Sequence, residues 1–198
     1  MRTILFVCTG NTCRSPMAEA MLRDLAGRAG KAVEVRSAGL GAVDGYPVSP
    51  NAAETLRRRK LPVPGPSRAL SADQIAWADL ILTMTSSHKQ AIVRRHPDAA
   101  DKTYTLKEFA LRDGALAADL EEAERLYSEW QIRRALGQNL SEEERRRLEE
   151  LERRLPDFDI ADPFGGPLSF YEKSADEIEN AVLRLLDKLE DAEHRKPD

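Results

Sequence analysis

The stretch that decides the fold is residues 8 to 16, which read Cys8-Thr9-Gly10-Asn11-Thr12-Cys13-Arg14-Ser15-Pro16. It follows a short apolar run over 3–7 that is typical of a strand buried on both faces of a parallel sheet. After it, apolar residues recur at helical spacing, and Pro16 suits a first helical turn because its missing N–H would be unpaired there anyway. The sequence therefore predicts a strand, a polar loop and a helix.

The same alternation continues along the chain. Strands are expected over 33–38, 80–84 and 102–106, and helices over 50–60 and 86–95. A final amphipathic helix is expected behind a capping box formed by Ser174 and Glu177. Strands that alternate with helices predict the α/β class, with a four-stranded parallel sheet and helices on both faces.

One stretch, residues 112–155, breaks this alternation. It holds nine arginines and twelve acidic residues, and it accounts for −3 of the net charge of −4. A stop signal at Gly137 and a second capping box at Ser141 and Glu144 divide its helical pattern in two. We expect a single domain over 1–198 that carries an inserted, charged helical hairpin at about 112–155.

Composition narrows the functional class. A chain of 198 residues fits one good-sized domain, and no apolar run approaches the roughly 20 residues that cross a bilayer. The N-terminus does not resemble a secretory signal, so a cytoplasmic location is expected. Acidic net charge argues against a nucleic acid or a membrane as partner. Two cysteines are too few for a disulfide scaffold, which favours a chemical role for them.

The loop over 8–15 is placed where open α/β sheets bind ligands, between the carboxyl end of a strand and the amino end of a helix. Gly10 and Asn11 tolerate backbone angles that other residues avoid. The loop amides can therefore converge into a nest around one tetrahedral anion.

Cys8 and Arg14, separated by five residues, add chemistry to this nest. A thiol among converging amides and beside a guanidinium is expected to be a thiolate at neutral pH. Arg14 offers planar, two-pronged hydrogen bonding to two phosphoryl oxygens, and Ser15 can donate its hydroxyl to the sulfur. The pattern predicts attack of Cys8 on phosphorus to give a phosphocysteine, with no metal and no cofactor.

Expulsion of the leaving group needs an acid, and hydrolysis of the intermediate needs a base. Asp162 is the candidate for both, because Pro163 stiffens the backbone that aims it. Asp157 and Asp159 in the same loop are the rivals.

Four motifs together resemble the low-molecular-weight protein tyrosine phosphatase family, and most closely its bacterial protein-arginine phosphatase branch. They are the loop itself, Ser-Ala-Gly at 37–39, Thr-Leu-Lys-Glu at 105–108 and Asp-Pro-Phe-Gly-Gly at 162–166. The resemblance runs along roughly the whole chain outside 112–155. It implies phosphorylated protein substrates, with the opposing protein kinase as a further partner.

By position, the resemblance also implies residue roles: Cys8 as nucleophile, Arg14 as phosphate clamp, Ser15 as partner of the thiolate, and Asp162 as acid and base. The remaining loop residues, with two from outside the loop, are implied to bind the substrate. These are Thr9, Gly10, Asn11, Thr12, Cys13, Leu40 and Phe164. In that family Asn11 holds the loop in shape.

Two of these positions bear on the phosphorylated group. Thr12 stands where tyrosine-specific relatives commonly carry a bulky aliphatic residue, and its smaller side chain leaves room for a guanidinium. Phe164 stands where many of them have Tyr, and an aromatic face near the Asp162 carboxylate favours a cationic group. We therefore expect phosphoarginine as the substrate, with phosphotyrosine as the alternative.

Other interpretations of the cysteines remain. Cys13 either packs in the core or traps an oxidised Cys8 as a disulfide. Thioredoxin-coupled arsenate reductases share a similar loop but relay oxidation through later cysteines, and none follows Cys13 here. An inactive phosphoprotein-binding module would usually have lost Cys8, Arg14 or Asp162.

The histidines and the hairpin complete the sequence picture. His88, His96 and His194 are too far apart in sequence to bind zinc with the cysteines, and we expect all three at the surface. The hairpin is either a solvated decoration held by Glu–Arg pairs, or a cap, substrate filter or dimer contact anchored by Tyr127 and Trp130.

Overall fold

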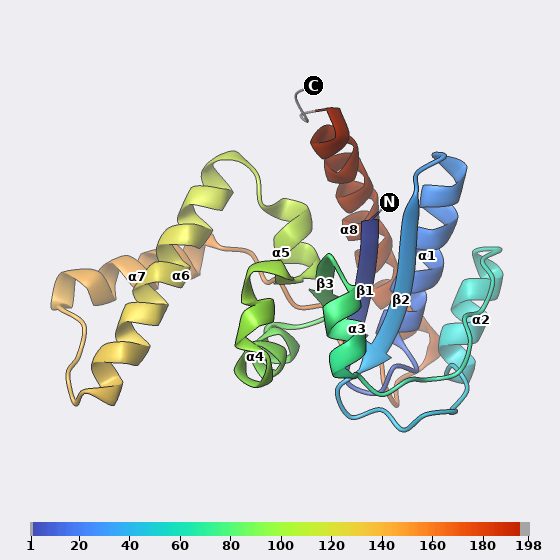
Figure 1. Ribbon diagram of the computed structural model, residues 1–198, viewed down its shortest axis with the longest axis horizontal. Helices are drawn as coiled ribbons and strands as arrows, with labels where there is room; N and C mark the ends of the chain where they lie inside the picture. The colour runs from blue at the N-terminus through green and yellow to red at the C-terminus, as the bar shows by residue number, and fades with distance from the viewer. Residues whose placement is uncertain (1, 195–198) are drawn as a thin grey trace. The chain divides into compact units, whose positions relative to one another are not determined.

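The computed structural model describes residues 2–194, with side chains described through residue 189. The chain forms two compact units (Figure 1). One runs to Ala110 and resumes at Phe158, and the other is Leu111–Asp157. Among the described helices, none combines the length and the apolar run that crossing a membrane requires.

The first unit is built on a parallel sheet of four strands in the order β2-β1-β3-β4. The strands are β1 (Arg2–Cys8), β2 (Val33–Gly39), β3 (Leu80–Thr83) and β4 (Thr103–Thr105). All four predicted strands are present, with ends within two residues of the expected ones. The predicted α/β class with a four-stranded parallel sheet is confirmed.

Six helices surround this sheet in the described chain. They are α1 (Arg14–Arg28), α2 (Pro50–Arg58), α3 (Ala72–Trp77), α4 (Ser86–Arg95), α5 (Leu106–Leu111) and α8 (Leu168–His194), with a 3-10 helix at Pro97–Lys102. The sequence did not predict α3, α5 or the 3-10 helix. Each has only six residues, which is too short for a helical period to show in the pattern of apolar residues.

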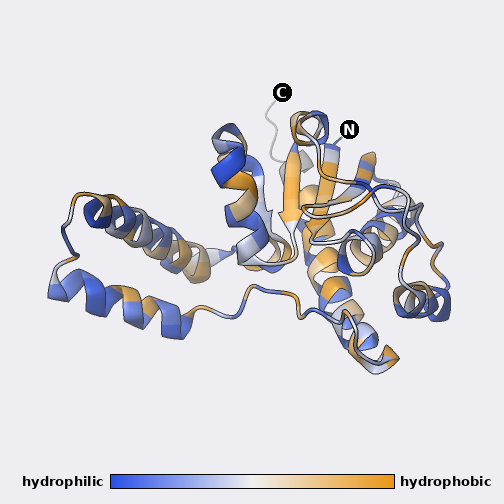
Figure 2. Cartoon of the chain, turned by 90° about the horizontal axis from the view of Figure 1, so that it is seen from below, coloured by the Kyte–Doolittle hydropathy of each residue, from blue (hydrophilic) through white to orange (hydrophobic). Residues whose placement is uncertain are grey.

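The first strand explains why helices cover both faces of the sheet. Side chains alternate between the faces of a strand, and β1 is apolar throughout. Ile4, Phe6 and Cys8 belong to the core cluster that includes α1 and α8, whereas Leu5 and Val7 belong to the cluster with α3 and α4. Figure 2 shows the central strands as strongly hydrophobic.

The predicted start of the last helix is wrong. The helix α8 begins at Leu168, so Ser174 and Glu177 lie inside it and form no capping box. The Ser174 hydroxyl donates to the carbonyl oxygen of Ala161 at 3.2 Å. A local capping pattern does not reveal such a tertiary acceptor, which is why the sequence misplaced this boundary.

The second unit consists of two helices, α6 (Gly114–Ala135) and α7 (Glu142–Arg154). The expected stop is present, with Gly137 at a φ of 72°, and Ser141 and Glu144 form the expected capping box. Its core is small: Ala123, Leu126 and Leu151, with Leu148 and Leu155 packed at their margin. That this segment is an insertion into the family domain stays a prediction.

Candidate active site

The loop between β1 and α1 lies where the sequence predicted it. Cys8 ends β1 and is only 3% exposed. The helix α1 begins at Arg14, and Cys13 before it gives no side-chain cap, so the amides of the first turn have no capping side chain. Gly39 of β2 lets the loop approach closely, because a Cβ there would lie 2.6 Å from the Thr9 carbonyl oxygen.

Asn11 shapes the loop. Its φ is 53°, a left-handed conformation that Asn tolerates. Gly10 has no positive φ. The Asn11 side-chain amide donates to the hydroxyls of Ser15 at 2.9 Å and Ser37 at 2.8 Å. Its side-chain oxygen accepts from the Arg68 amide at 2.8 Å. Every polar atom of this buried side chain is therefore engaged.

Two donors face the Cys8 sulfur. The Ser15 hydroxyl oxygen lies 3.0 Å from Sγ, and the Asn11 backbone amide donates to Sγ at 3.3 Å. The Ser15 oxygen accepts from Asn11, so its own hydrogen can be donated to the Cys8 sulfur at 3.0 Å or to the more distant Ala38 carbonyl oxygen at 3.4 Å. Both contacts can stabilise the Cys8 sulfur when it leaves as an anion.

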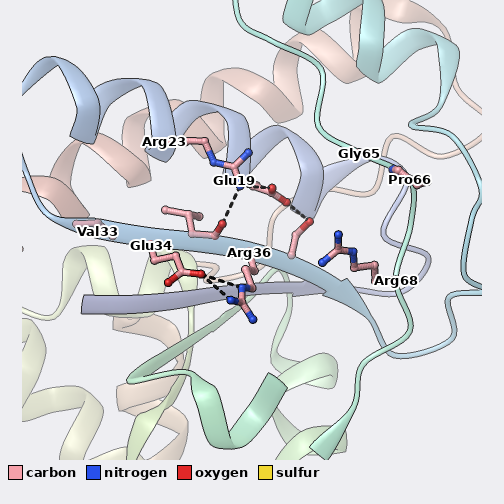
Figure 3. A pocket seen from close by; sticks show the side chains of 10 residues that line it. Glu19, Arg23, Val33, Glu34, Arg36, Gly65, Pro66 and Arg68 are labelled. Atoms are coloured by element: carbon pink, nitrogen blue, oxygen red, sulfur yellow. Dashed lines mark hydrogen bonds and ion pairs between the residues drawn. The ribbon is translucent and has the colours of Figure 1, made fainter. Parts of the chain in front are cut away.

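The hydrogen bonds continue behind the loop to the edge of the sheet. The Ser37 hydroxyl accepts from Asn11 and donates to a carboxylate oxygen of Glu19 on α1. Arg23, one turn further along α1, pairs with the same carboxylate at 2.6 Å. The loop is thus tied to both α1 and β2 through buried polar groups. Figure 3 shows the part of this hydrogen-bond network at Glu19 and Arg23.

Arg14 brings the second predicted group to the loop. Its guanidinium donates to the carbonyl oxygen of Ile160 at 3.0 Å and to the Asp162 carboxylate at 2.7 Å. The Arg14 side chain is 5% exposed and that of Asp162 is 52% exposed. The other Asp162 oxygen accepts from the Phe164 amide at 3.1 Å, which orients the carboxylate. Three of the five guanidinium N–H groups remain for an anion.

The two rival carboxylates are placed differently. Asp159 accepts from the backbone amide of Ser86 at 2.7 Å and from its hydroxyl at 2.9 Å, at the start of α4. Asp157 belongs to the second unit. Of the three candidates, Asp162 is the one that pairs with Arg14.

His88 is a residue of this site that the sequence reading missed. The expectation that it lies at the surface is wrong: it is 7% exposed, and its Nε2 lies 2.9 Å from the Thr9 hydroxyl oxygen. Among the described residues, nothing bonds to its buried Nδ1. Burial lowers the pKa of His88, and the Arg14 charge lowers this pKa further.

A positional signal for His88 did exist. It lies in the first turn of α4, the helix that follows β3. Because β3 lies beside β1, the loops after both strands open at the same edge of the sheet. Only the order of the strands shows that this position of His88 lies beside the loop that follows β1. Of the other histidines, His96 is half-buried rather than exposed, and the side chain of His194 lies outside the described residues.

Cys13 lies among polar side chains beside the loop. Its thiol donates to the Ser49 hydroxyl at 3.3 Å and lies 3.6 Å from the Tyr171 hydroxyl. Tyr171, which the sequence reading did not single out, is buried, and burial followed by its bond to Cys13 raises its pKa. Both cysteines are free thiols.

The remaining predicted residues surround the loop at different depths. Thr12 is half-buried, and its carbonyl oxygen accepts from the Ser49 amide at 2.8 Å. The Leu40 amide donates to the Cys8 carbonyl oxygen at 3.0 Å, while its side chain packs on the core cluster with α3 and α4. Phe164 is 76% exposed. Within residues 2–194, no group of three His, Cys, Asp or Glu side chains is placed to hold a metal ion.

Comparison with known proteins assigns the chain to a family. The model of the family described as "Low molecular weight phosphotyrosine protein phosphatase" matches residues 3–155. A protein-arginine-phosphatase from Geobacillus stearothermophilus is 38% identical over 189 residues, covering 94% of this chain and 95% of that one. A probable low molecular weight protein-tyrosine-phosphatase, EpsP of Ralstonia nicotianae, is 41% identical but covers 55% of this chain and 73% of its own.

The fold agrees with these matches. The solved structure of the YwlE arginine phosphatase from Geobacillus stearothermophilus superposes with a TM-score of 0.72 at 36% identity, and each chain is covered in full.

Proposed function

The chain belongs to the low-molecular-weight protein tyrosine phosphatase family, and on that premise we propose that it hydrolyses phosphoarginine in proteins through a phosphocysteine. The observation that carries the mechanism is the meeting of three groups at one loop: the Cys8 sulfur with two donors on it, the buried Arg14, and Asp162 paired with Arg14. Its substrates are phosphorylated proteins, and the opposing protein kinase is the partner that supplies them.

In the first step, the Cys8 thiolate attacks phosphorus, an S–P bond forms and the P–N bond to the guanidinium breaks. Arg14 donates to two of the phosphoryl oxygens, and the phosphate takes up the N–H groups that face Asp162 in the free loop. Asp162, released from that pair, takes up a proton from solvent and delivers it to the departing nitrogen, so that arginine does not leave as an anion.

In the second step, Asp162 removes a proton from water, and the resulting hydroxide attacks the phosphocysteine. The S–P bond breaks, inorganic phosphate forms and the electron pair returns to Cys8. The Ser15 hydroxyl and the Asn11 amide stabilise that thiolate as it leaves, as their distances of 3.0 and 3.3 Å to the sulfur indicate.

Two observations favour arginine over tyrosine as the phosphorylated residue. In the sequence comparison, the relative named a protein-arginine-phosphatase aligns with nearly the whole chain, whereas EpsP, named a probable protein-tyrosine-phosphatase, aligns with little more than half of it. Thr12 lies half-buried in the loop, where a small polar side chain leaves room for a planar guanidinium. Protein tyrosine phosphatase activity is the second candidate, because both activities use the same loop.

A matched pair of peptides tests the proposal. Two peptides of one sequence carry either phosphoarginine or phosphotyrosine, and kcat/KM is measured on each with the natural protein, Thr12→Ile and Thr12→Ser. We expect the natural protein and Thr12→Ser to prefer phosphoarginine, and Thr12→Ile to lose that preference. A natural protein that prefers phosphotyrosine contradicts the proposal; turnover of neither peptide, with retention on a phosphorylated column, indicates a binding module instead.

We also propose that the chain works in the cytoplasm and that Cys13 protects Cys8. A reducing compartment keeps Cys8 a thiol, and the two cysteines bracket one short loop. Mass spectrometry after mild peroxide treatment should find a bond between Cys8 and Cys13. Sulfinic acid at Cys8 without that bond excludes the protective role.

A further inference from the structure

A second pocket lies at the edge of the sheet, away from the Cys8 sulfur. It has a volume of about 450 Å³ and is bordered by residues 33–37 of β2, by Glu19 and Arg23 of α1, and by Gly65, Pro66 and Arg68. Figure 3 shows this edge of the sheet with α1 beside it and residues 65–68 passing near the end of β2. None of its residues carries out the chemistry proposed above.

The edge of β2 in this pocket has backbone groups without partners. β2 pairs only with β1, and the Gly39 amide donates to the Arg68 carbonyl oxygen at 2.9 Å on the side away from β1. Because backbone groups alternate along a strand, those of Val35 and Ser37 face the same outer side. Arg23 donates to the Val35 carbonyl oxygen there. Within residues 2–194, the amides of Val35 and Ser37 and the Ser37 carbonyl meet no hydrogen-bond partner.

One arginine of the pocket has no acidic partner within the described residues. Arg23 pairs with Glu19 at 2.6 Å, and Arg36 pairs with Glu34 at 2.6 Å. The guanidinium of Arg68 makes no hydrogen bond or ion pair within the described residues. Figure 3 shows it near the head of the β2 arrow, with no dashed line to any residue drawn. The pocket therefore holds one uncompensated positive charge in a chain whose net charge is −4.

We propose that this pocket binds an extended, acidic segment of a partner polypeptide, which adds to β2 as a further strand and places a carboxylate on Arg68. Main-chain hydrogen bonds to Val35 and Ser37 supply affinity in this mode of recognition. A carboxylate on the planar Arg68 guanidinium supplies the preference for acidic sequences. The site needs no phosphoryl group, so it is separate from the phosphatase reaction.

Docking at this edge places the partner next to the residues that hold Asn11, and with it the loop of residues 8–15, in position. The Arg68 amide donates to the Asn11 side chain at 2.8 Å, and the Ser37 hydroxyl accepts from it at the same distance. A bound strand would hydrogen-bond to the backbone of Ser37 and to the guanidinium of Arg68. The pocket thus holds a partner chain at a fixed place relative to Cys8 without using the loop itself.

The test measures binding of an unphosphorylated peptide to the full chain. The probe is a fluorescent hexapeptide of alternating Glu and Val, followed by anisotropy. We expect Lys–Val peptides, and Glu–Val peptides N-methylated at alternate residues, to bind at least roughly tenfold more weakly. Arg68→Glu should lose a similar factor. Arg57→Glu is the matched control, because Arg57 is exposed on α2 outside the pocket and should leave binding unchanged.

Amide NMR spectra locate the bound peptide. We expect shifts at Val35 and Ser37; shifts confined to residues 8–14 overturn the proposal. It is also overturned if the Glu–Val peptide does not bind, if N-methylation leaves binding unchanged, or if Arg68→Glu binds as tightly as the natural protein. Because the probe carries no phosphoryl group, failure here leaves the phosphatase proposal untouched, and loss of phosphatase activity leaves this one untouched.

Discussion

The loop of residues 8–15 in the first unit and the helix pair α6 and α7 in the second use polar residues in opposite ways. Around the loop, Asn11, Ser15 and Ser37 are buried, and each polar side-chain atom meets a partner. In the helix pair, arginines and acids meet at the surface, as in Arg147 with Glu122. The loop is a connected, buried network. The charged groups of the helix pair lie at the solvated surface instead, where one arginine can meet two acids, as Arg147 also meets Glu150.

This difference teaches where single changes should matter. Removing one member of a buried network leaves other buried groups unpaired, and that desolvation penalty is much larger than the net value of the bond. Removing one member of an exposed pair leaves a charge that water can solvate. We therefore expect effects to shrink from the loop, through its buried supports, to the surface of α6 and α7.

Cys8→Ser should give the largest effect. A hydroxyl is a far weaker nucleophile than a thiolate, and we expect kcat on a phosphoarginine peptide to fall by roughly 10⁴-fold or more. Single-turnover and steady-state assays measure it, with circular dichroism as the check on folding. Cys13→Ser is the matched control and should keep most of the activity. Undiminished turnover in Cys8→Ser would end the phosphocysteine mechanism.

Asp162→Asn comes next. An amide can neither protonate the leaving nitrogen nor activate water, so kcat should fall by about 10²- to 10⁴-fold. Asp159→Asn is the control of the same chemistry in the same loop, because Asp159 bonds to Ser86 at the start of α4 instead of to Arg14. If Asp159→Asn costs as much as Asp162→Asn, the assignment of the acid is wrong.

The sequence predicted the positions of Cys8, Arg14 and Asp162 from different signals. Cys8 and Arg14 lie in one loop, so their spacing fixes their geometry, and β1 is apolar on both faces, which fixes the place of the loop. The pairing of Asp162 with Arg14 joins residues 148 positions apart, and only the motif around Pro163 pointed to it. Local spacing and strong periodicity were therefore the reliable signals.

The parts that the sequence did not predict depend on the order of the strands. His88 reaches Thr9 because β3 lies beside β1, and Ser37 reaches Asn11 because β2 lies on the other side. The start of α8 was misplaced because Ser174 bonds to Ala161 across the fold. Such partners are set by tertiary contacts, which leave no periodic trace in one sequence.

Asn11 variants test the buried network itself. Asn11→Ala removes the bonds to Ser15, Ser37 and the Arg68 amide. It also places alanine at a φ of 53°, a conformation that alanine tolerates less well than asparagine. We expect a loss of roughly 2–4 kcal/mol in the free energy of unfolding. Asn11→Gly relieves the backbone cost alone and should recover about 1 kcal/mol of it. Denaturant titration measures both; equal stability of Asn11→Ala and the natural protein contradicts the network.

His88 gives a smaller effect that depends on pH. Its pKa in the folded protein is lowered, chiefly by burial, so the folded state favours the neutral ring. The unfolded chain then binds more protons, and the contribution of His88 to stability is complete above about pH 6.5 and declines as the pH falls below it. His88→Gln should flatten this slope, and His96→Gln should not. NMR titration of the ring should show a midpoint below 6.5.

The capping box of α7 should give the smallest effect, in a separate window of pH. The Ser141 amide, together with Arg133, lowers the pKa of Glu144 to about 2. For a carboxyl with a lowered pKa, the stabilisation is present above the unfolded value of 4.5 and is lost as the pH falls toward 2. Acid should therefore weaken the His88 region first and the α7 capping box only later.

Two variants of Glu144 separate the cap from the charge. Glu144→Gln keeps a side-chain acceptor for the Ser141 amide but loses the charge that pairs with Arg133, whereas Glu144→Ala loses both. Because this carboxylate lies at the surface and water reaches it, water replaces much of what either variant removes. We therefore expect shifts in hydrogen-exchange protection confined to the first turn of α7. A global loss of protection comparable with that of Asn11→Ala would show that the two units do not differ in the way proposed.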